Sequence, residues 1–222
     1  MNGAPIMVST EKNFIFVHIR KTGGNSIQSV LSEYAIDEVE TSAQSQDGDE
    51  QFDMSNEYGL WKHAPLREYK GKLPEEEYEE MFKFSVVRNP WERLVSMYFT
   101  PSVGREEWDR DEFLEVVEYA STLREYICVD SVWDRAAEKV GLGSRGDLQK
   151  DIDFLIRFEQ INEDFRRVCD MLDLGCDGLP EKNSSDRKHY SEYYDEELVS
   201  IVGEKFQEEI EEFGYEFEGG RA

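Results

Sequence analysis

The sequence predicts an α/β fold in which a mainly parallel central sheet is flanked by helices. Three short apolar runs, rich in aromatic and β-branched residues, are typical of buried strands and cover residues 13–19, 83–88 and 153–158. Segments with helical spacing separate them, and a parallel connection needs such a crossover. With 222 residues, the chain is long enough for one well-buried core, so we expect a single domain over residues 1–222.

The first predicted unit is a strand, a glycine loop and a helix. The strand ends at the sequence Arg-Lys-Thr-Gly-Gly-Asn-Ser, residues 20–26, and apolar residues then recur at helical spacing from Ile27 to Tyr34. Residues 38–57 are polar, acidic and poor in aliphatic side chains, which predicts a mobile surface loop. Such a loop could also border a substrate cleft.

The rest of the chain continues the alternation. Pro74 and the acidic residues after it predict a helix over residues 75–82, since proline and acids favour a first turn. After the second strand, Asn89-Pro90 caps and opens another helix. Glu159 ends the third strand, where a carboxylate is more often a structural cap than a base. Further helices are predicted over residues 111–121, 131–140, 161–172 and 196–213.

The charge of the chain disfavours two classes of partner. Fifty Asp and Glu residues stand against 25 Lys and Arg, which gives a formal net charge of -25 at pH 7. We therefore expect binding neither to nucleic acid nor to an anionic membrane. The 13 Phe, 11 Tyr and 4 Trp residues predict a folded protein with a hydrated acidic surface rather than a disordered chain.

Cysteine and histidine spacing predicts no metal site. Cys128, Cys169 and Cys176 form neither a Cys-x-x-Cys pair nor an even set, so we expect buried reduced thiols. The histidines show no zinc-ligand spacing. No apolar stretch is long enough for a bilayer, and the N-terminus shows no basic region followed by an apolar run, so we expect a cytoplasmic protein.

The glycine loop after the first strand is a candidate anion site. A turn that leaves a buried strand and enters a helix presents backbone N–H groups at the positive end of the helix dipole. Gly23 and Gly24 permit close approach, and Lys21 supplies a positive charge. The hydroxyl groups of Thr22 and Ser26 are additional donors. A simple tight turn is the alternative, because Lys-Thr-Gly-Gly alone is a weak signal.

A nucleoside-triphosphate P-loop does not fit this segment. If Lys21-Thr22 were its Lys-Ser/Thr pair, the required glycines would fall on Ile15 and Arg20. There is also no clear strand-terminal Asp to complete a magnesium site. A P-loop-like kinase is therefore the weaker alternative.

Two motifs in order resemble the carbohydrate sulfotransferases of the Golgi-type family and their soluble bacterial relatives. They are Phe-Val-His-Ile-Arg-Lys-Thr-Gly-Gly-Asn-Ser, residues 16–26, and Phe-Ser-Val-Val-Arg-Asn-Pro-Trp-Glu-Arg-Leu-Val-Ser-Met-Tyr, residues 84–98. Similar landmarks at residues 62–65, 157–159, 164–165 and 213–217 extend the resemblance over nearly the whole chain. The resemblance implies a P-loop-like three-layer fold and an enzyme that transfers a sulfuryl group.

The resemblance also implies a donor, 3′-phosphoadenosine 5′-phosphosulfate, used as co-substrate without a metal ion. The first motif would hold its 5′-phosphosulfate and the second its 3′-phosphate. The implied donor-binding residues are Lys21, Thr22, Gly23, Gly24, Asn25, Ser26, Arg88 and Ser96. The polar, basic segment around Arg187 and Lys188 is similar to family loops that fold over the nucleotide, which adds Arg187. The family usually has Pro in place of Arg20 and Thr in place of Asn25.

The expected chemistry assigns two catalytic residues. Sulfuryl transfer resembles phosphoryl transfer, but the group carries less negative charge, so a lysine and backbone donors can replace magnesium. Lys21 is the candidate that stabilises the departing phosphate oxygen. His63 lies in a segment that resembles the one carrying the family's catalytic histidine, and it is the candidate general base. His18 competes, but its apolar strand predicts packing beneath the loop.

The sequence therefore predicts a sulfotransferase that acts on a hydroxyl group of a carbohydrate or similar small acceptor. A non-catalytic nucleotide-binding protein that retains both anion motifs is the alternative. Four basic residues near His63 either guide an anionic acceptor or form a solvated face: Lys62, Arg67, Lys70 and Lys72.

Overall fold

A four-stranded sheet is the centre of the computed structural model, which describes residues 8–35, 58, 60–100, 104–129, 146–176, 178–180 and 187–219. The strand order is β1-β2-β3-β4. The three predicted strands are present as β2 (Phe14–Val17), β3 (Phe82–Val87) and β4 (Phe154–Arg157), and they pair in parallel. The sequence analysis missed β1 (Val8–Ser9), a two-residue strand antiparallel to β2. The mainly parallel sheet is confirmed.

The register brings the carboxyl ends of the parallel strands together. Val17 of β2 pairs with Ser85, and Val87 of β3 pairs with Arg157 of β4. The Ser85 hydroxyl donates a buried hydrogen bond of 2.7 Å to the Val17 carbonyl, which fixes β3 against β2 at this end. The loops that follow the strands therefore lie at one edge of the sheet, where ligands of open α/β sheets bind.

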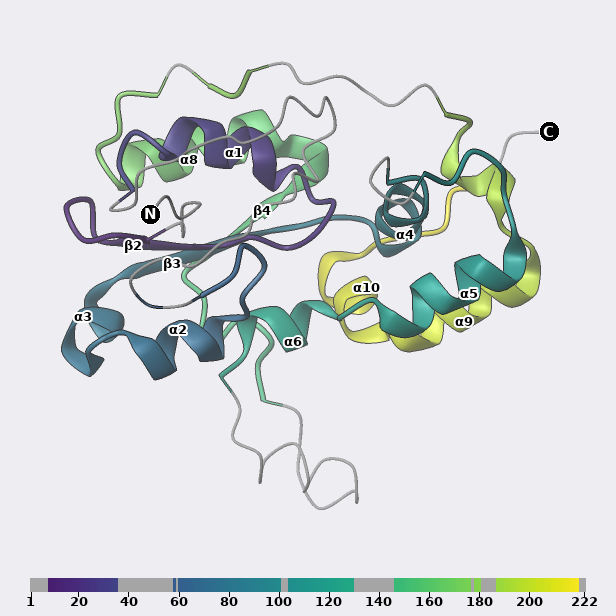
Figure 1. The fold of residues 1–222 in the computed structure, drawn as a ribbon, viewed down its shortest axis with the longest axis horizontal. Helices are drawn as coiled ribbons and strands as arrows, with labels where there is room; N and C mark the ends of the chain where they lie inside the picture. The colour runs from purple at the N-terminus through teal and green to yellow at the C-terminus, as the bar shows by residue number, and fades with distance from the viewer. Residues whose placement is uncertain are drawn as a thin grey trace.

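Helices cover both faces of the sheet, as Figure 1 shows. On one face lie α1 (Gly24–Leu31) and α8 (Ile161–Met171); on the other lie α2 (Leu66–Lys72), α3 (Glu75–Glu80) and α6 (Leu123–Ile127). Side chains of β2 alternate between two buried clusters, Phe14 and Phe16 with α1 and α8, Ile15 and Val17 with the opposite layer. The predicted three-layer arrangement is confirmed.

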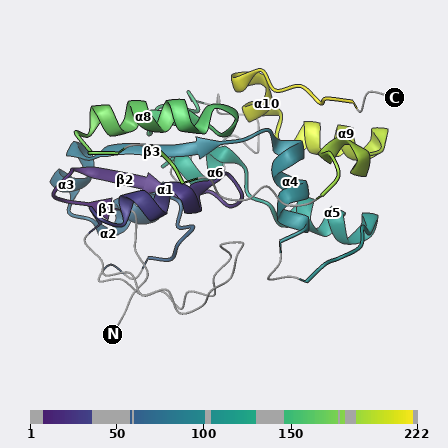
Figure 2. The ribbon, with the colours of Figure 1, turned by 90° about the horizontal axis from the view of Figure 1, so that it is seen from above.

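A further group of helices packs beside the end of the sheet (Figure 2). It contains α4 (Pro90–Tyr98), α5 (Arg110–Tyr119), α9 (Glu196–Lys205) and α10 (Gln207–Phe213), with 3-10 turns η2 (Phe158–Gln160) and η3 (Tyr190–Tyr193) nearby. The Asn89 side chain accepts hydrogen bonds from the N–H groups of Trp91 and Glu92, which confirms the predicted cap of α4. The single helix predicted over residues 196–213 is instead two helices that meet at Phe206.

The differences from the sequence-based prediction have simple reasons. α2 and α6 were missed because helices of 7 and 5 residues are too short to show a period. The break at Phe206 was missed because Val202, Phe206 and Ile210 pack on the same core and continue the apolar pattern across it. The predicted acidic loop over residues 38–57 and the predicted helix over residues 131–140 lie outside the described residues.

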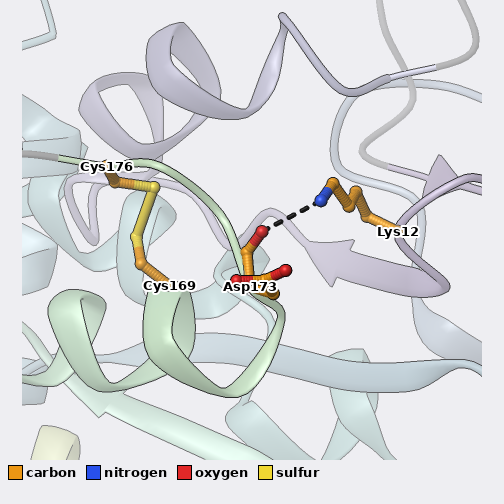
Figure 3. Close-up of a disulfide and its surroundings, with 4 residues drawn as sticks. All are labelled: Lys12, Cys169, Asp173 and Cys176. Atoms are coloured by element: carbon orange, nitrogen blue, oxygen red, sulfur yellow. Dashed lines mark hydrogen bonds between the residues drawn. A yellow bond between two sulfur atoms is a disulfide. The ribbon is translucent and has the colours of Figure 1, made fainter.

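The expectation of reduced thiols was wrong for two of the three cysteines. Cys169 and Cys176 form a disulfide with a Cα–Cα distance of 6.0 Å (Figure 3). Asp173, at φ 50°, turns the chain back after α8, and its carbonyl accepts a hydrogen bond from Lys12. The sequence analysis missed this pair because it took the odd number of cysteines as evidence against a disulfide. Cys128 is the third cysteine, and it is buried.

The disulfide removes one argument for a cytoplasmic protein, since disulfides are typical of oxidising compartments. The cellular location therefore stays a prediction. In the part of the chain that the structure describes, no helix combines the length and the apolarity that crossing a membrane requires.

Candidate active site

The glycine loop joins β2 to α1 as the sequence predicted. Gly23 adopts φ 79° and caps α1, so its positive φ suits glycine. A Cβ atom at Gly24 would lie 2.2 Å from the ring of His18, and one at Gly23 would lie 2.8 Å from Ile161. Both glycines are therefore required sterically, because the loop is packed closely between neighbouring side chains.

The other residues of the loop divide into anchors and exposed groups. The Thr22 side chain is fully buried, and its hydroxyl donates to the Ile19 carbonyl at 2.9 Å, so this hydroxyl closes the loop instead of pointing at an anion. Lys21, Asn25 and Ser26 are only half-buried. Lys21 also holds a φ of 62°, uncommon for a residue with a side chain. The buried part of the loop is therefore anchored by Thr22, and its polar side chains Lys21, Asn25 and Ser26 lie near solvent.

Arg88 connects the second motif to the first. Its side chain is 7% exposed, and its Nη1 donates to the Lys21 carbonyl at 2.9 Å. Its guanidinium plane lies over the ring of Phe158, 3.9 Å from the ring centroid, and its buried Nε has no hydrogen-bond partner within the structure. The two predicted donor-binding motifs thus meet at one point of the sheet edge, as two halves of one nucleotide site must.

Glu92 contacts two predicted donor-binding cations, Arg88 of the second motif and Arg187. Its Oε1 accepts from Arg88 Nη2 and lies 3.8 Å from Nη2 of Arg187. Burial, together with the nearby charge of Arg88, lowers the pKa of Arg187. Ser96 follows Glu92 by four residues on α4 and therefore lies on the same side of the helix. The predicted residues Arg88 and Arg187 are brought together at one carboxylate, and Ser96 lies one helical turn further along α4.

Two histidines lie beneath and beside the glycine loop. His63 Nδ1 is 2.8 Å from the His18 carbonyl oxygen, and the two rings are 4.8 Å apart. Because a carbonyl oxygen only accepts, Nδ1 carries a hydrogen, and Nε2 is the nitrogen at which the His63 ring gains or loses a proton. The hydrogen bond to the carbonyl of His18, the residue after β2, therefore orients the predicted general base.

His18 packs where the sequence placed it, beneath the loop. Its side chain is 3% exposed, and its ring stacks on Phe16 and touches Gly24. Burial, and next the charge of His63, lowers the pKa of His18 well below its ordinary value. His18 therefore stays neutral, and it supports both the loop and His63.

A sequence model of the sulfotransferase family matches residues 4–216. The chain belongs to the sulfotransferase family. This confirms the resemblance and the fold class, and it identifies the protein as a member of an enzyme family that uses 3′-phosphoadenosine 5′-phosphosulfate. Neither the curated proteins nor the solved structures give a significant match.

Two of the four basic residues predicted near His63 contact neighbouring helices. Arg67 donates to the Glu125 carbonyl at 2.7 Å, which ties α2 to α6. Lys70 pairs with Glu79 at 3.1 Å, which ties α2 to α3. Both side chains remain exposed, and their contacts lie at the surface. The role of the four basic residues stays a prediction.

Glu159 has the structural role that its place at a strand end predicted. Its Oε1 accepts from the Asn89 N–H at 3.0 Å, and its Oε2 accepts from the Tyr215 hydroxyl at 3.3 Å. A cavity of about 400 Å³ opens beside Asn89, Glu92 and Glu159. Among the described residues, no group of three or more His, Cys, Asp or Glu side chains is arranged to hold a metal ion.

Sequence reasoning missed the roles of Glu92 and Phe158 in the sulfotransferase site. Both lie within quoted motif segments, but neither was assigned a function. The spacing of Arg88 and Glu92, four residues apart, was a usable signal, because such pairs meet on one helical turn. The stacking of Phe158 on Arg88 joins two different strand ends and had no local signal.

Proposed function

We propose that this sulfotransferase moves a sulfuryl group from 3′-phosphoadenosine 5′-phosphosulfate to a hydroxyl group of a carbohydrate or similar small acceptor without a net negative charge. The observation that carries the proposal is the hydrogen bond from Arg88 to the Lys21 carbonyl, because it joins the two anion motifs into one site. A donor with phosphates at both the 5′ and the 3′ position needs two anion sites that lie next to each other.

The donor would lie across the carboxyl edge of the sheet. Its 5′-phosphosulfate would bind over the N-terminus of α1, where Lys21 and the loop backbone supply positive charge. Its 3′-phosphate would bind Arg88, Ser96 and Arg187. Glu92 already pairs with Arg88 and approaches Arg187, so a phosphate there would replace or share an existing carboxylate contact.

The transfer step needs one bond to break, one to form and one proton to move. The bond between sulfur and the bridging phosphate oxygen breaks, and a bond between sulfur and the acceptor oxygen forms. Lys21 stabilises the charge on the departing phosphate oxygen. The hydroxyl proton of the acceptor passes to Nε2 of His63, the nitrogen left basic by the hydrogen bond of Nδ1.

The uncharged acceptor follows from the electrostatics of the protein. The net charge of -25 repels polyanions, and the nearby cations Arg67 and Lys70 already bond to the Glu125 carbonyl and to Glu79. An acceptor recognised by hydrogen bonds and apolar contact avoids this repulsion. We also propose that the enzyme is cytoplasmic. The Cys169–Cys176 disulfide does not support this location.

The proposal is tested with donor labelled in its sulfuryl group and a panel of neutral mono- and disaccharides. Labelled product should form in the presence of a strong chelator, and Lys21→Ala should reduce transfer by about 10²–10³-fold. The exposed Lys72→Ala is the matched control and should transfer normally. Tight binding of adenosine 3′,5′-bisphosphate without transfer to any hydroxyl would favour a non-catalytic protein, and magnesium-dependent turnover of ATP would favour a kinase.

A further inference from the structure

Trp61 is exposed beside the candidate base. Among the described residues, the exposed large apolar side chains are Trp61, Tyr119 and Met171, with Trp61 45% exposed. The Trp61 and His63 rings meet edge to face, with centroids 5.9 Å apart. An exposed indole therefore lies next to the group that removes the acceptor proton in the proposed function.

The exposure of Trp61 is imposed by an ordered turn. The N–H of Ala64 donates to the Trp61 carbonyl at 2.9 Å, which closes a turn over residues 61–64. Leu60 before the turn and Ala64 at its end are buried, 1% and 0% exposed. The backbone on both sides is anchored in the core below α2. The turn thus fixes the backbone of Trp61, and the indole remains partly in solvent beside His63, although burying it fully would stabilise the protein.

We propose that Trp61 is the platform on which the pyranose ring of a neutral sugar acceptor stacks; this inference rests on the proposed function. A pyranose has a face of C–H groups and a rim of hydroxyl groups. Packing the C–H face on the indole buries apolar surface on both partners while the rim stays free to form hydrogen bonds. A sugar placed in this way directs a rim hydroxyl toward His63, because the two rings adjoin.

The charges near the turn favour a neutral sugar over a uronic acid or a sulfated sugar. Arg67 and Lys70 contact other helices, as described above. Lys62 lies within the turn, close enough for its charge to lower the pKa of His18. Arg20 also acts on His18, but these cations belong to a molecule of net charge -25, so stacking and hydrogen bonds have to supply most of the affinity.

The first test compares the kinetics of Trp61→Ala, Trp61→Phe and a control, Tyr119→Ala, which removes an exposed aromatic ring from α5. With the best neutral disaccharide of the panel, Trp61→Ala should raise KM for the acceptor roughly 10-fold, the effect of about 1.4 kcal/mol of lost stacking. Trp61→Phe should recover part of this loss. Affinity for adenosine 3′,5′-bisphosphate, the melting temperature and the kinetics of Tyr119→Ala should stay at wild-type values.

The second test measures sugar binding without turnover. Tryptophan fluorescence is titrated with the same disaccharide, with its glucuronic-acid counterpart and with the acyclic polyol glucitol, each in the presence of adenosine 3′,5′-bisphosphate. The neutral disaccharide should change the emission of the wild type and not that of Trp61→Phe. Glucitol should bind more weakly, because it lacks a ring face.

The outcomes separate the platform from the proposed function. If the disaccharide binds through Trp61 but accepts no label, the platform stands and the proposed function fails. If transfer proceeds with the same KM in Trp61→Ala, the function stands and the platform is wrong. Equal binding of glucitol, preference for the glucuronic-acid sugar, or no sugar binding at all would also overturn the platform.

Discussion

The donor side and the acceptor side of the site are built in different ways. On the donor side, groups from three strand ends are held by buried contacts, including Thr22 to Ile19, Arg88 to Lys21 and the cap of α4 by Asn89. On the acceptor side, one turn carries Trp61 and His63, and a 2.8 Å hydrogen bond to the His18 carbonyl orients the base. The donor side is preorganised by the sheet, whereas the acceptor side depends on a short connection.

This difference indicates that acceptor specificity can change independently of donor binding. The donor contacts are coupled to the sheet, so a change there disturbs the fold. The turn contacts the donor side through His18, whose ring packs on Gly24, but the donor contacts named above come from residues outside the turn. Substitutions in the turn should therefore change the acceptor reaction and leave the donor site in place.

The largest expected effect separates the two sides at His63. His63→Ala should lower the single-turnover rate of sulfuryl transfer by about 10²–10⁴-fold, because the acceptor loses its positioned base. Affinity for adenosine 3′,5′-bisphosphate should hardly change, since the donor contacts come from other residues. Transfer rate, bisphosphate affinity and melting temperature are measured on the same preparation.

A structural role for His63 would give a different pattern. Melting temperature, donor affinity and rate would then fall together, and the separation of the two sides would be lost. Near-normal transfer by a well-folded variant would remove His63 as the base. The remaining candidates are His18, which burial keeps neutral, and Glu159, which already accepts two hydrogen bonds.

The next effect is expected on the donor side, at Arg88. Arg88→Ala should weaken binding of adenosine 3′,5′-bisphosphate by about 10–150-fold, the range for hydrogen bonds to a charged group. Binding of adenosine 5′-monophosphate, which lacks the 3′-phosphate, should change much less. Isothermal titration of both nucleotides with wild type and variant measures the difference.

Arg88→Lys serves as a matched variant for this measurement. Lysine keeps the charge but loses the planar fork that bonds to Lys21 and stacks on Phe158, so recovery should be partial. If the wild type bound both nucleotides equally well, the assignment of Arg88 to the 3′-phosphate would fail, and the donor side would contain only the glycine loop.

The same contrast explains how much the sequence could predict. The strand-loop-helix unit was predictable because a buried strand, a glycine loop and helical spacing follow one another in the sequence. Arg88 was assigned through the resemblance, and its place at a strand end of a parallel sheet agrees with that assignment. Arg187 was found only through resemblance, and the structure places it beside Glu92. The stacking of Phe158 on Arg88 and the disulfide of Cys169 depend on how distant segments pack, for which one sequence carries no period or spacing.

The smallest expected effect concerns the packing of α10 against the donor-side helix α4. It is measured as the pH dependence of the free energy of unfolding. Arg93 of α4 and Glu209 of α10 lie 3.8 Å apart, and each is 3% exposed. Burial raises the pKa of Glu209 from 4.5 to about 7, and the charge of Arg93 opposes that shift. Ionising Glu209 is therefore harder in the folded protein than in the unfolded chain.

The direction of the pH effect follows from this raised pKa. The protonated carboxyl contributes stability that is fully present below pH 4.5 and is lost as the pH rises to about 7. Glu209→Gln keeps a neutral side chain at every pH, so its free energy of unfolding should fall less than that of the wild type between pH 5 and pH 8. Urea unfolding at four pH values measures this, with the exposed Glu211→Gln as control. A variant that retains the full wild-type slope would show that the carboxyl is ionised throughout, and that the ion pair with Arg93 dominates its burial beneath α4.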